Sequence, residues 1–164
     1  MERAELDDRF AYVRVEHNNR LSLLALAYVE ATQTDKYRQV FVSGSNETLT
    51  LESGVITGFS ADARQWAMHK GRVIAQPGYE WTPAPAKALG SPPPSSIQSM
   101  VVPVGANDAA GLVWKPIAGG WTAFDSQNGK LGLWRFTYQC LQKDFCLAVQ
   151  AWSSQMQQNQ KAGR

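Results

Sequence analysis

Short segments of apolar or alternating residues, separated by turn-forming residues at close intervals, are the feature that most restricts the fold of this chain. In the first sixty residues such segments occupy positions 12–15, 21–29, 37–43, 48–51 and 55–59. Asn, Ser and Gly lie between them, for example at Asn18-Asn19 and Ser53-Gly54, and these residue types accept the backbone conformations of tight turns. Strands that follow each other so closely predict an antiparallel β-meander.

Residues 21–29 form the longest apolar run of the chain. A run without polar alternation predicts a strand that is buried on both faces or that is central in its sheet. The run is far shorter than the roughly 18 residues that a membrane-spanning helix requires. We therefore expect a core strand at this position.

Residues 60–71 predict a single short helix. Ser60 would cap its first turn, where the helix dipole favours Asp62, and Gly71 would end it. The segment 73–75 that follows predicts one more short strand.

The second half of the chain predicts another group of strands, at positions 100–104, 111–117, 121–124 and 131–140. Asn128-Gly129 is the strongest hairpin signal in the chain. The last apolar segment fits two structures. One is a strand over 145–152 that pairs with 133–140 about a turn centred on Lys143. The other is a helix capped by Asp144 that aligns Phe145, Val149, Trp152 and Met156 in one stripe. The apolar run favours the strand.

Composition divides the chain into four parts. Residues 1–75 form the β-meander with the short helix, residues 76–99 a Pro-, Ser- and Gly-rich loop or linker, residues 100–152 the second group of strands, and residues 153–164 a polar tail. Whether the two groups of strands share one sheet system is open at this stage. The predicted fold class is mainly β, an antiparallel meander that forms a sandwich or an open barrel with one short helix.

The only two cysteines, Cys140 and Cys146, lie close together in the chain. Their spacing predicts a local disulfide that closes a hairpin or turn, and the alternative is a pair of reduced, buried thiols in a cytosolic protein. Only 18% of the residues are charged, and a surface solvated by neutral polar groups favours an exported protein. The first residues lack the apolar core of a signal peptide, so export would require a signal or lipid anchor that has been removed.

The sequence contains no recognisable set of catalytic, cofactor-binding or metal-binding residues. We interpret His17 as a surface polar residue in a turn and His69 as another at the end of the predicted helix, and no zinc-site spacing occurs. No motif of a serine hydrolase, a dinucleotide site or a phosphate loop is present. The sequence therefore predicts a protein that is not an enzyme and uses no cofactor. A net charge of +2 with scattered basic residues does not predict nucleic-acid binding.

Aromatic residues are the main candidates for a binding surface. The six tryptophans are Trp66, Trp81, Trp114, Trp121, Trp134 and Trp152. Trp134 and Trp152 are interpreted as core residues. Tyr79 and Trp81 adjoin the proline-rich segment and are predicted to form a binding surface, because exposed rings stack on sugars and on protein partners. A glycosylation sequon, Asn46-Glu47-Thr48, lies in a predicted turn.

The first half also carries a family resemblance. The residues that carry it are AYVRV at 11–15, LSLLALAYVE at 21–30, FVS at 41–43 and ETLTLESGVITG at 47–58. Their order resembles the opening of the YjbF-like family, whose members are lipoproteins associated with bacterial group 4 capsule and exopolysaccharide loci. The resemblance implies a periplasmic or outer-membrane-attached accessory protein without catalysis. No lipobox cysteine lies near Met1, and the proline-rich centre and the cysteine pair have no counterpart in that family.

These observations lead to one main hypothesis and several alternatives. The main hypothesis is a non-catalytic accessory or assembly protein of the bacterial cell envelope, in polysaccharide export or secretion, that binds other envelope proteins. The first alternative is a carbohydrate-binding β-domain that uses exposed Trp and Tyr. A hydrolase whose residues meet only in three dimensions, or a structural subunit of a larger envelope or virion assembly, is also open. Contact with the membrane is expected only through the removed lipid anchor.

Overall fold

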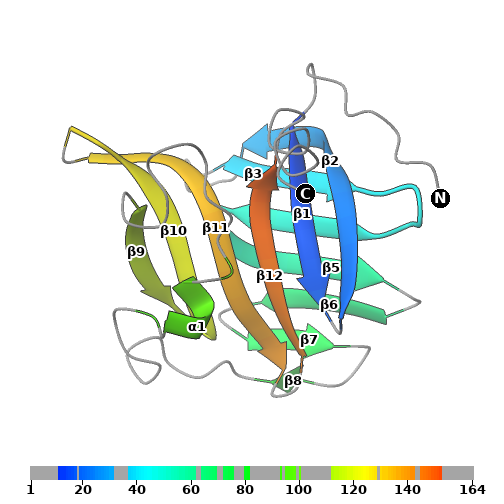
Figure 1. Ribbon diagram of the computed structural model, residues 1–164. Coiled ribbons are helices and arrows are strands. Elements are labelled where there is room, and N and C mark those ends of the chain that lie inside the picture. The colour runs from blue at the N-terminus through cyan, green and yellow to red at the C-terminus, as the bar shows by residue number, and fades with distance from the viewer. Residues whose placement is uncertain are drawn as a thin grey trace.

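The computed structural model describes the part of the chain between residues 11 and 152, with gaps. The described residues are 11–17, 19–31, 37–61, 64–69, 72–75, 80–81, 93, 95–98, 100, 112–128, 130–142 and 145–152. They form one 12-stranded antiparallel sheet and one short helix, α1 (Ser95–Gln98). The mainly β fold class is thereby confirmed. Figure 1 shows that the sheet curls, so that β1, β2 and β12 lie in front of β5, β6 and β7 and cross them at a steep angle.

The strands follow the chain order across the sheet, with one exception. The first group consists of β1 (Tyr12–His17), β2 (Arg20–Ala31), β3 (Tyr37–Val42), β4 (Thr48–Glu52), β5 (Val55–Ala61), β6 (Arg64–His69), β7 (Arg72–Ala75) and β8 (Glu80–Trp81). The second group consists of β9 (Leu112–Ile117), β10 (Gly120–Gln127), β11 (Lys130–Gln142) and β12 (Phe145–Trp152). The exception is that β1 pairs with β12, with Val15 opposite Val149. This pairing joins the two groups into one sheet.

Several predicted turns have the backbone that their residues favour. Asn19, after β1, has a φ of 61°, and Asn128, after β10, has a φ of 52°. Ser53 and Gly54, between β4 and β5, also have positive φ angles, 50° and 81°. Two consecutive positive φ angles are the geometry that joins two antiparallel strands with the correct twist.

The helix predicted over residues 60–71 is wrong. Strand β5 continues to Ala61, and β6 returns against it with Phe59 opposite Trp66 and Ala61 opposite Arg64. The capping residues were compatible with a helix, but an isolated helix of that length has little stability of its own. Pairing with β5 on one side and β7 on the other makes β6 part of the sheet. Among the described residues, a short helix lies at Ser95–Gln98 instead.

The last apolar segment is a strand, as its composition favoured. Strand β12 pairs with β11 with Cys140 opposite Cys146 and Phe136 opposite Gln150. This register is that of a turn centred on residue 143. The same strand pairs with β1 on its other side, so it is central in the sheet.

The inner face of the curled sheet is filled with apolar side chains from both groups of strands. The buried members are Val13, Val15, Leu24, Phe41, Leu49, Leu51, Ile56, Phe59, Ala61, Leu141, Phe145, Leu147 and Val149. Trp134 and Leu26 pack against this cluster and are partly buried. The predicted core position of Trp134 is therefore confirmed, and Trp152, 5% exposed, is buried as well.

The sheet closes on itself where β5 meets β11, and the contact uses side chains in place of a strand pair. Gln139, fully buried, accepts a hydrogen bond from the Ile56 backbone N–H at 2.8 Å and donates one to the Ile56 carbonyl at 2.9 Å. Strand β5 pairs with β6 only from Gly58 onward, so Ile56 faces no strand on that side. The Gln139 amide thus takes the place of a neighbouring strand for one residue, as buried backbone groups require partners.

The tip of the β4–β5 hairpin is anchored at the same place. The Thr137 hydroxyl donates a hydrogen bond to the Gly54 carbonyl. A Cβ atom on Gly54 would lie 2.5 Å from Thr122 Oγ1 and 2.8 Å from Trp134 Cδ1. Glycine is therefore required at this turn both for its positive φ and for the close approach of the hairpin to β10 and β11.

A second, smaller cluster covers part of the opposite, outer face. Ile97 of α1 packs against Trp121, Ala123 and Phe136. Figure 1 shows α1 lying across β10 and β11. The helix therefore covers one end of the outer face.

Candidate functional site

The side chains of Tyr79 and Trp81, the two residues predicted to form a binding surface, lie outside the part of the chain that the structure describes. Tyr79 lies outside the described residues. Trp81 is the last residue of β8, and only its backbone pairing, opposite Val73, is described.

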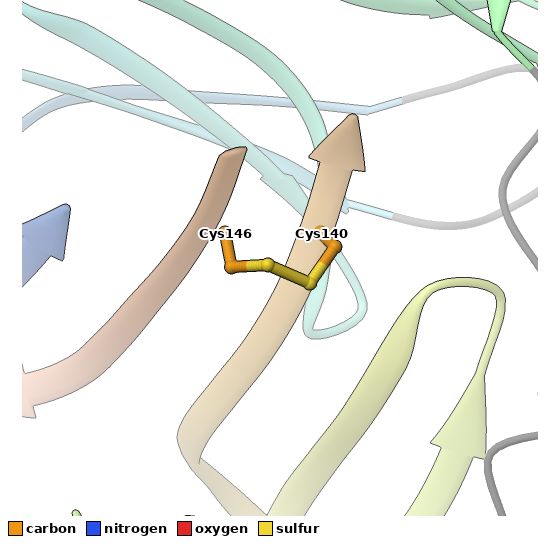
Figure 2. Close-up of a disulfide and its surroundings, with 2 residues drawn as sticks. All are labelled: Cys140 and Cys146. Carbon is orange, nitrogen blue, oxygen red and sulfur yellow. A yellow bond between two sulfur atoms is a disulfide. The ribbon is translucent and has the colours of Figure 1, made fainter. Parts of the chain in front are cut away.

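The predicted disulfide is present. Cys140 on β11 and Cys146 on β12 are directly opposite each other, with their Cα atoms 3.8 Å apart, and their sulfur atoms are bonded (Figure 2). The bond joins the two strands of the last hairpin near its turn. A disulfide of this kind persists in oxidising compartments, which fits a protein outside the cytoplasm.

The interpretation of His17 as a surface residue is wrong. His17 is the last residue of β1, and its side chain is buried, 5% exposed. The alternation of the strand places it on the inner face with Val13 and Val15, and the turn begins after it. The period of two could have indicated this, but the neighbouring Asn18-Asn19 favoured a turn assignment.

His17 belongs to a buried polar cluster that the sequence did not predict. Its Nε2 lies 3.6 Å from Oε2 of Glu47, which is also buried. The Ser22 hydroxyl donates to Glu47 Oε2 at 3.0 Å, and the Ser43 hydroxyl donates to Oε1 at 3.4 Å. The Glu47 backbone N–H donates to Ser43 Oγ at 3.2 Å. The end of the β1–β2 hairpin and the β3–β4 turn, which are about 25 residues apart in sequence, are thus held together at one end of the inner face.

Two aromatic rings pack against His17. The His17 ring centroid lies 5.2 Å from that of Phe59, edge to face, and 5.7 Å from that of Phe145. Neither His17 ring nitrogen has a hydrogen-bond partner in the structure. Because His17 and Glu47 are buried, the arrangement of the cluster suits the positioning of strands and of the β3–β4 turn.

The surface with the clearest capacity for contact is the outer face of β2, a central strand. Leu21 is 56% exposed and Tyr28 is 53% exposed, while Leu24 on the inner face is fully buried. Leu23 lies between them on the outer face and is half-buried. Of the two predicted alternatives, the structure shows the central position, between β1 and β3, and the exposed Leu21 and Tyr28 exclude burial on both faces.

We use the term "outer β2 stripe" for Leu21, Leu23 and Tyr28. Val42 of β3 is exposed on the same face. The other exposed large apolar side chains in the described ranges are Val29, Tyr37, Met100, Leu131 and Leu133. Exposed large apolar side chains on one face of a central strand are typical of a contact surface.

Charged residues border the outer β2 stripe on both sides. Arg38 of β3 donates to Glu30 at 3.1 Å and to Glu52 at 3.4 Å, across three adjacent strands. The hydrogen bond to Glu30 and the negative charge of Glu52 raise the pKa of Arg38. On the opposite side, Arg14 and Glu16 of β1 are the register partners of Leu23 and Leu21.

A small depression lies on the same outer face, between β1 and the end of α1. It measures about 20 Å³ and is lined by Arg14, Glu16, Met100, Phe136, Ala148 and Gln150. The guanidinium carbon of Arg14 lies 5.0 Å from the ring centroid of Trp152, which supports its position through a cation–π contact.

Within the described ranges, no three side chains of His, Cys, Asp or Glu come together as a metal site would require. No helix among the described residues has the length and hydropathy needed to span a membrane.

Comparison of the chain with known protein-family models, with curated proteins and with solved structures found no match. The family resemblance of the first half therefore remains an expectation from the sequence.

Proposed function

We propose that this protein is a non-catalytic accessory or assembly protein of the bacterial cell envelope, which acts by binding another envelope protein through the outer β2 stripe. The exposure of Leu21 and Tyr28 on a central strand is the observation that carries the proposal. Exposure of apolar side chains to water is unfavourable, because burial of one large apolar side chain contributes about 1.5–3 kcal/mol of favourable free energy. A partner that covers the stripe recovers that free energy.

The location outside the cytoplasm is supported by the disulfide between Cys140 and Cys146. The assignment to the envelope, to the periplasm or to the outer membrane, and to polysaccharide export or secretion, rests on the sequence and on the family resemblance. The filled inner face supports a role in contact, because the buried side chains leave the outer face as the surface that meets other molecules.

The proposal is tested by site-specific photo-crosslinking in the native host. A benzophenone amino acid at position 28 is expected to give one discrete adduct with an exported protein, and the added substitution Leu21→Asp is expected to abolish it. The same amino acid at Ser45, an exposed turn residue, is the control and should give no such adduct. Equal adducts from both positions, no adduct at all, or an adduct with a cytosolic protein would contradict the proposal.

A separate measurement tests the compartment. The intact mass of protein isolated from its native host, before and after reduction and alkylation, reports whether the cysteines are oxidised and whether the N-terminus is processed or lipidated. Two free thiols on an unprocessed chain would exclude export.

A further inference from the structure

The depression on the outer face has the construction of a small polar subsite. Met100, fixed by a hydrogen bond from its N–H to the Ile97 carbonyl at 3.1 Å, forms one side of it. Ala148 and Phe136 form apolar lining, and Ala148 leaves space because its side chain is small. The volume of about 20 Å³ has room for one small polar group, since a water molecule needs roughly 10–15 Å³ by the same measure.

The polar side chains around the depression are held by the sheet and by their neighbours. Arg14 is the register partner of Gln150, and Glu16 is the register partner of Ala148. Gln150 is 5% exposed, so its amide has little freedom. The Trp152 ring beside Arg14 restricts the guanidinium. Groups held in place before binding lose less entropy when a ligand arrives.

The chemistry of these groups indicates a carboxylate ligand. A guanidinium presents a planar fork of N–H donors that matches a carboxylate in two parallel hydrogen bonds. Glu16 lines the depression as well, and its carboxylate accepts from a donor next to the bound group, such as a peptide N–H. Arg14 is therefore the group that binds the carboxylate, and Glu16 requires a hydrogen-bond donor beside that carboxylate to offset the repulsion between the two negative charges.

The depression lies beside the outer β2 stripe, and this position indicates what kind of molecule carries the carboxylate. Leu23 is the register partner of Arg14 and Leu21 that of Glu16, so one ligand reaches the guanidinium, the exposed Leu21 and the half-buried Leu23. We infer that the partner presents an acidic side chain to Arg14, with neighbouring apolar residues on Leu21 and Leu23. This inference rests on the proposed function and names the kind of segment that the partner contributes, an acidic and apolar protein segment.

The inference is tested with a short peptide on the intact protein. The probe is acetyl-Leu-Asp-Leu-amide, and the readout is the indole N–H signal of Trp152 in a ¹H–¹⁵N NMR titration, assigned with Trp152→Phe. We expect a saturable shift that is weakened at least about tenfold by Arg14→Gln and partly restored by Arg14→Lys. Ala148→Leu, which fills the depression, is expected to weaken it similarly.

Matched controls make the outcome decisive. Arg38→Gln removes another arginine of the outer face and should leave the titration unchanged, and acetyl-Leu-Asn-Leu-amide should produce no saturable shift. Glucuronic acid is the second arm: a shift by this sugar acid without one by the peptide would overturn the protein-segment inference and indicate an acidic polysaccharide. No saturable shift with either probe, or an equal shift in Arg14→Gln, would also overturn it. None of these results depends on the crosslinking from position 28, so this inference can fail while the proposed function stands.

Discussion

Removal of the Gln139 amide tests how the curled sheet is closed. Gln139 is fully buried and makes two hydrogen bonds to the backbone of Ile56, which has no strand partner on that side. Gln139→Leu keeps a side chain of similar size but leaves a buried N–H and a buried carbonyl unpaired. Each buried polar group without a partner costs about 1–3 kcal/mol.

The expected loss is therefore about 2–5 kcal/mol in the free energy of unfolding, after the apolar side chain offsets part of the cost. For a chain of this length this corresponds to a fall in melting temperature of roughly 4–20 °C. Urea unfolding followed by tryptophan fluorescence and by circular dichroism measures the free energy. Hydrogen exchange at the Ile56 amide supplies a local readout, because that N–H loses its acceptor.

A matched control separates closure from a general effect of replacing glutamine. Gln39 of β3 is half-buried, and Gln39→Leu is expected to change the free energy of unfolding by about 0.5 kcal/mol or less. The reasoning is refuted if Gln139→Leu changes stability no more than Gln39→Leu does, or if the protection of the Ile56 amide is unaffected.

Three further predictions concern the turn, the buried cluster and the disulfide. Gly54→Ala is expected to lower the free energy of unfolding by about 2 kcal/mol or more, because of the positive φ and the contact of the new Cβ with Thr122 Oγ1. The control Gly44→Ala, with open space around its Cβ position, should cost about 0.5 kcal/mol or less. Equal costs of the two substitutions in thermal unfolding would contradict the role of Gly54. Glu47→Ala removes the acceptor of two hydroxyl groups and the acidic neighbour of the buried imidazole of His17. The free energy of unfolding, measured with urea, is expected to fall by about 2–4 kcal/mol. A fall below about 0.5 kcal/mol would show that the cluster does not hold the strands. Replacement of both cysteines by serine is expected to lower the free energy of unfolding by about 2 kcal/mol, because the loop that the disulfide closes is short. Unfolding of the wild-type protein with and without reductant checks this value independently of the substitutions.

The sequence determined the local structure of most of the described strands. Strand patterns and turn residues predicted β1 to β5, and Asn128-Gly129 predicted the hairpin of β10 and β11. The spacing of Cys140 and Cys146 predicted their bond. These features are local, because strand patterns, turn angles and a short covalent loop depend on residues that are close in sequence.

The tertiary structure decided which faces are covered and which distant segments meet. The pairing of β1 with β12, the insertion of Gln139 beside Ile56 and the approach of Glu47 to His17 all join residues that are far apart in the chain. The helix predicted at residues 60–71 failed for the same reason, since pairing with β5 outweighed a favourable set of caps. The apolar run at 21–29 predicted a central strand but could not show that its outer face is open. Burial depends on what the rest of the chain places over a strand, and a local pattern contains no information about that.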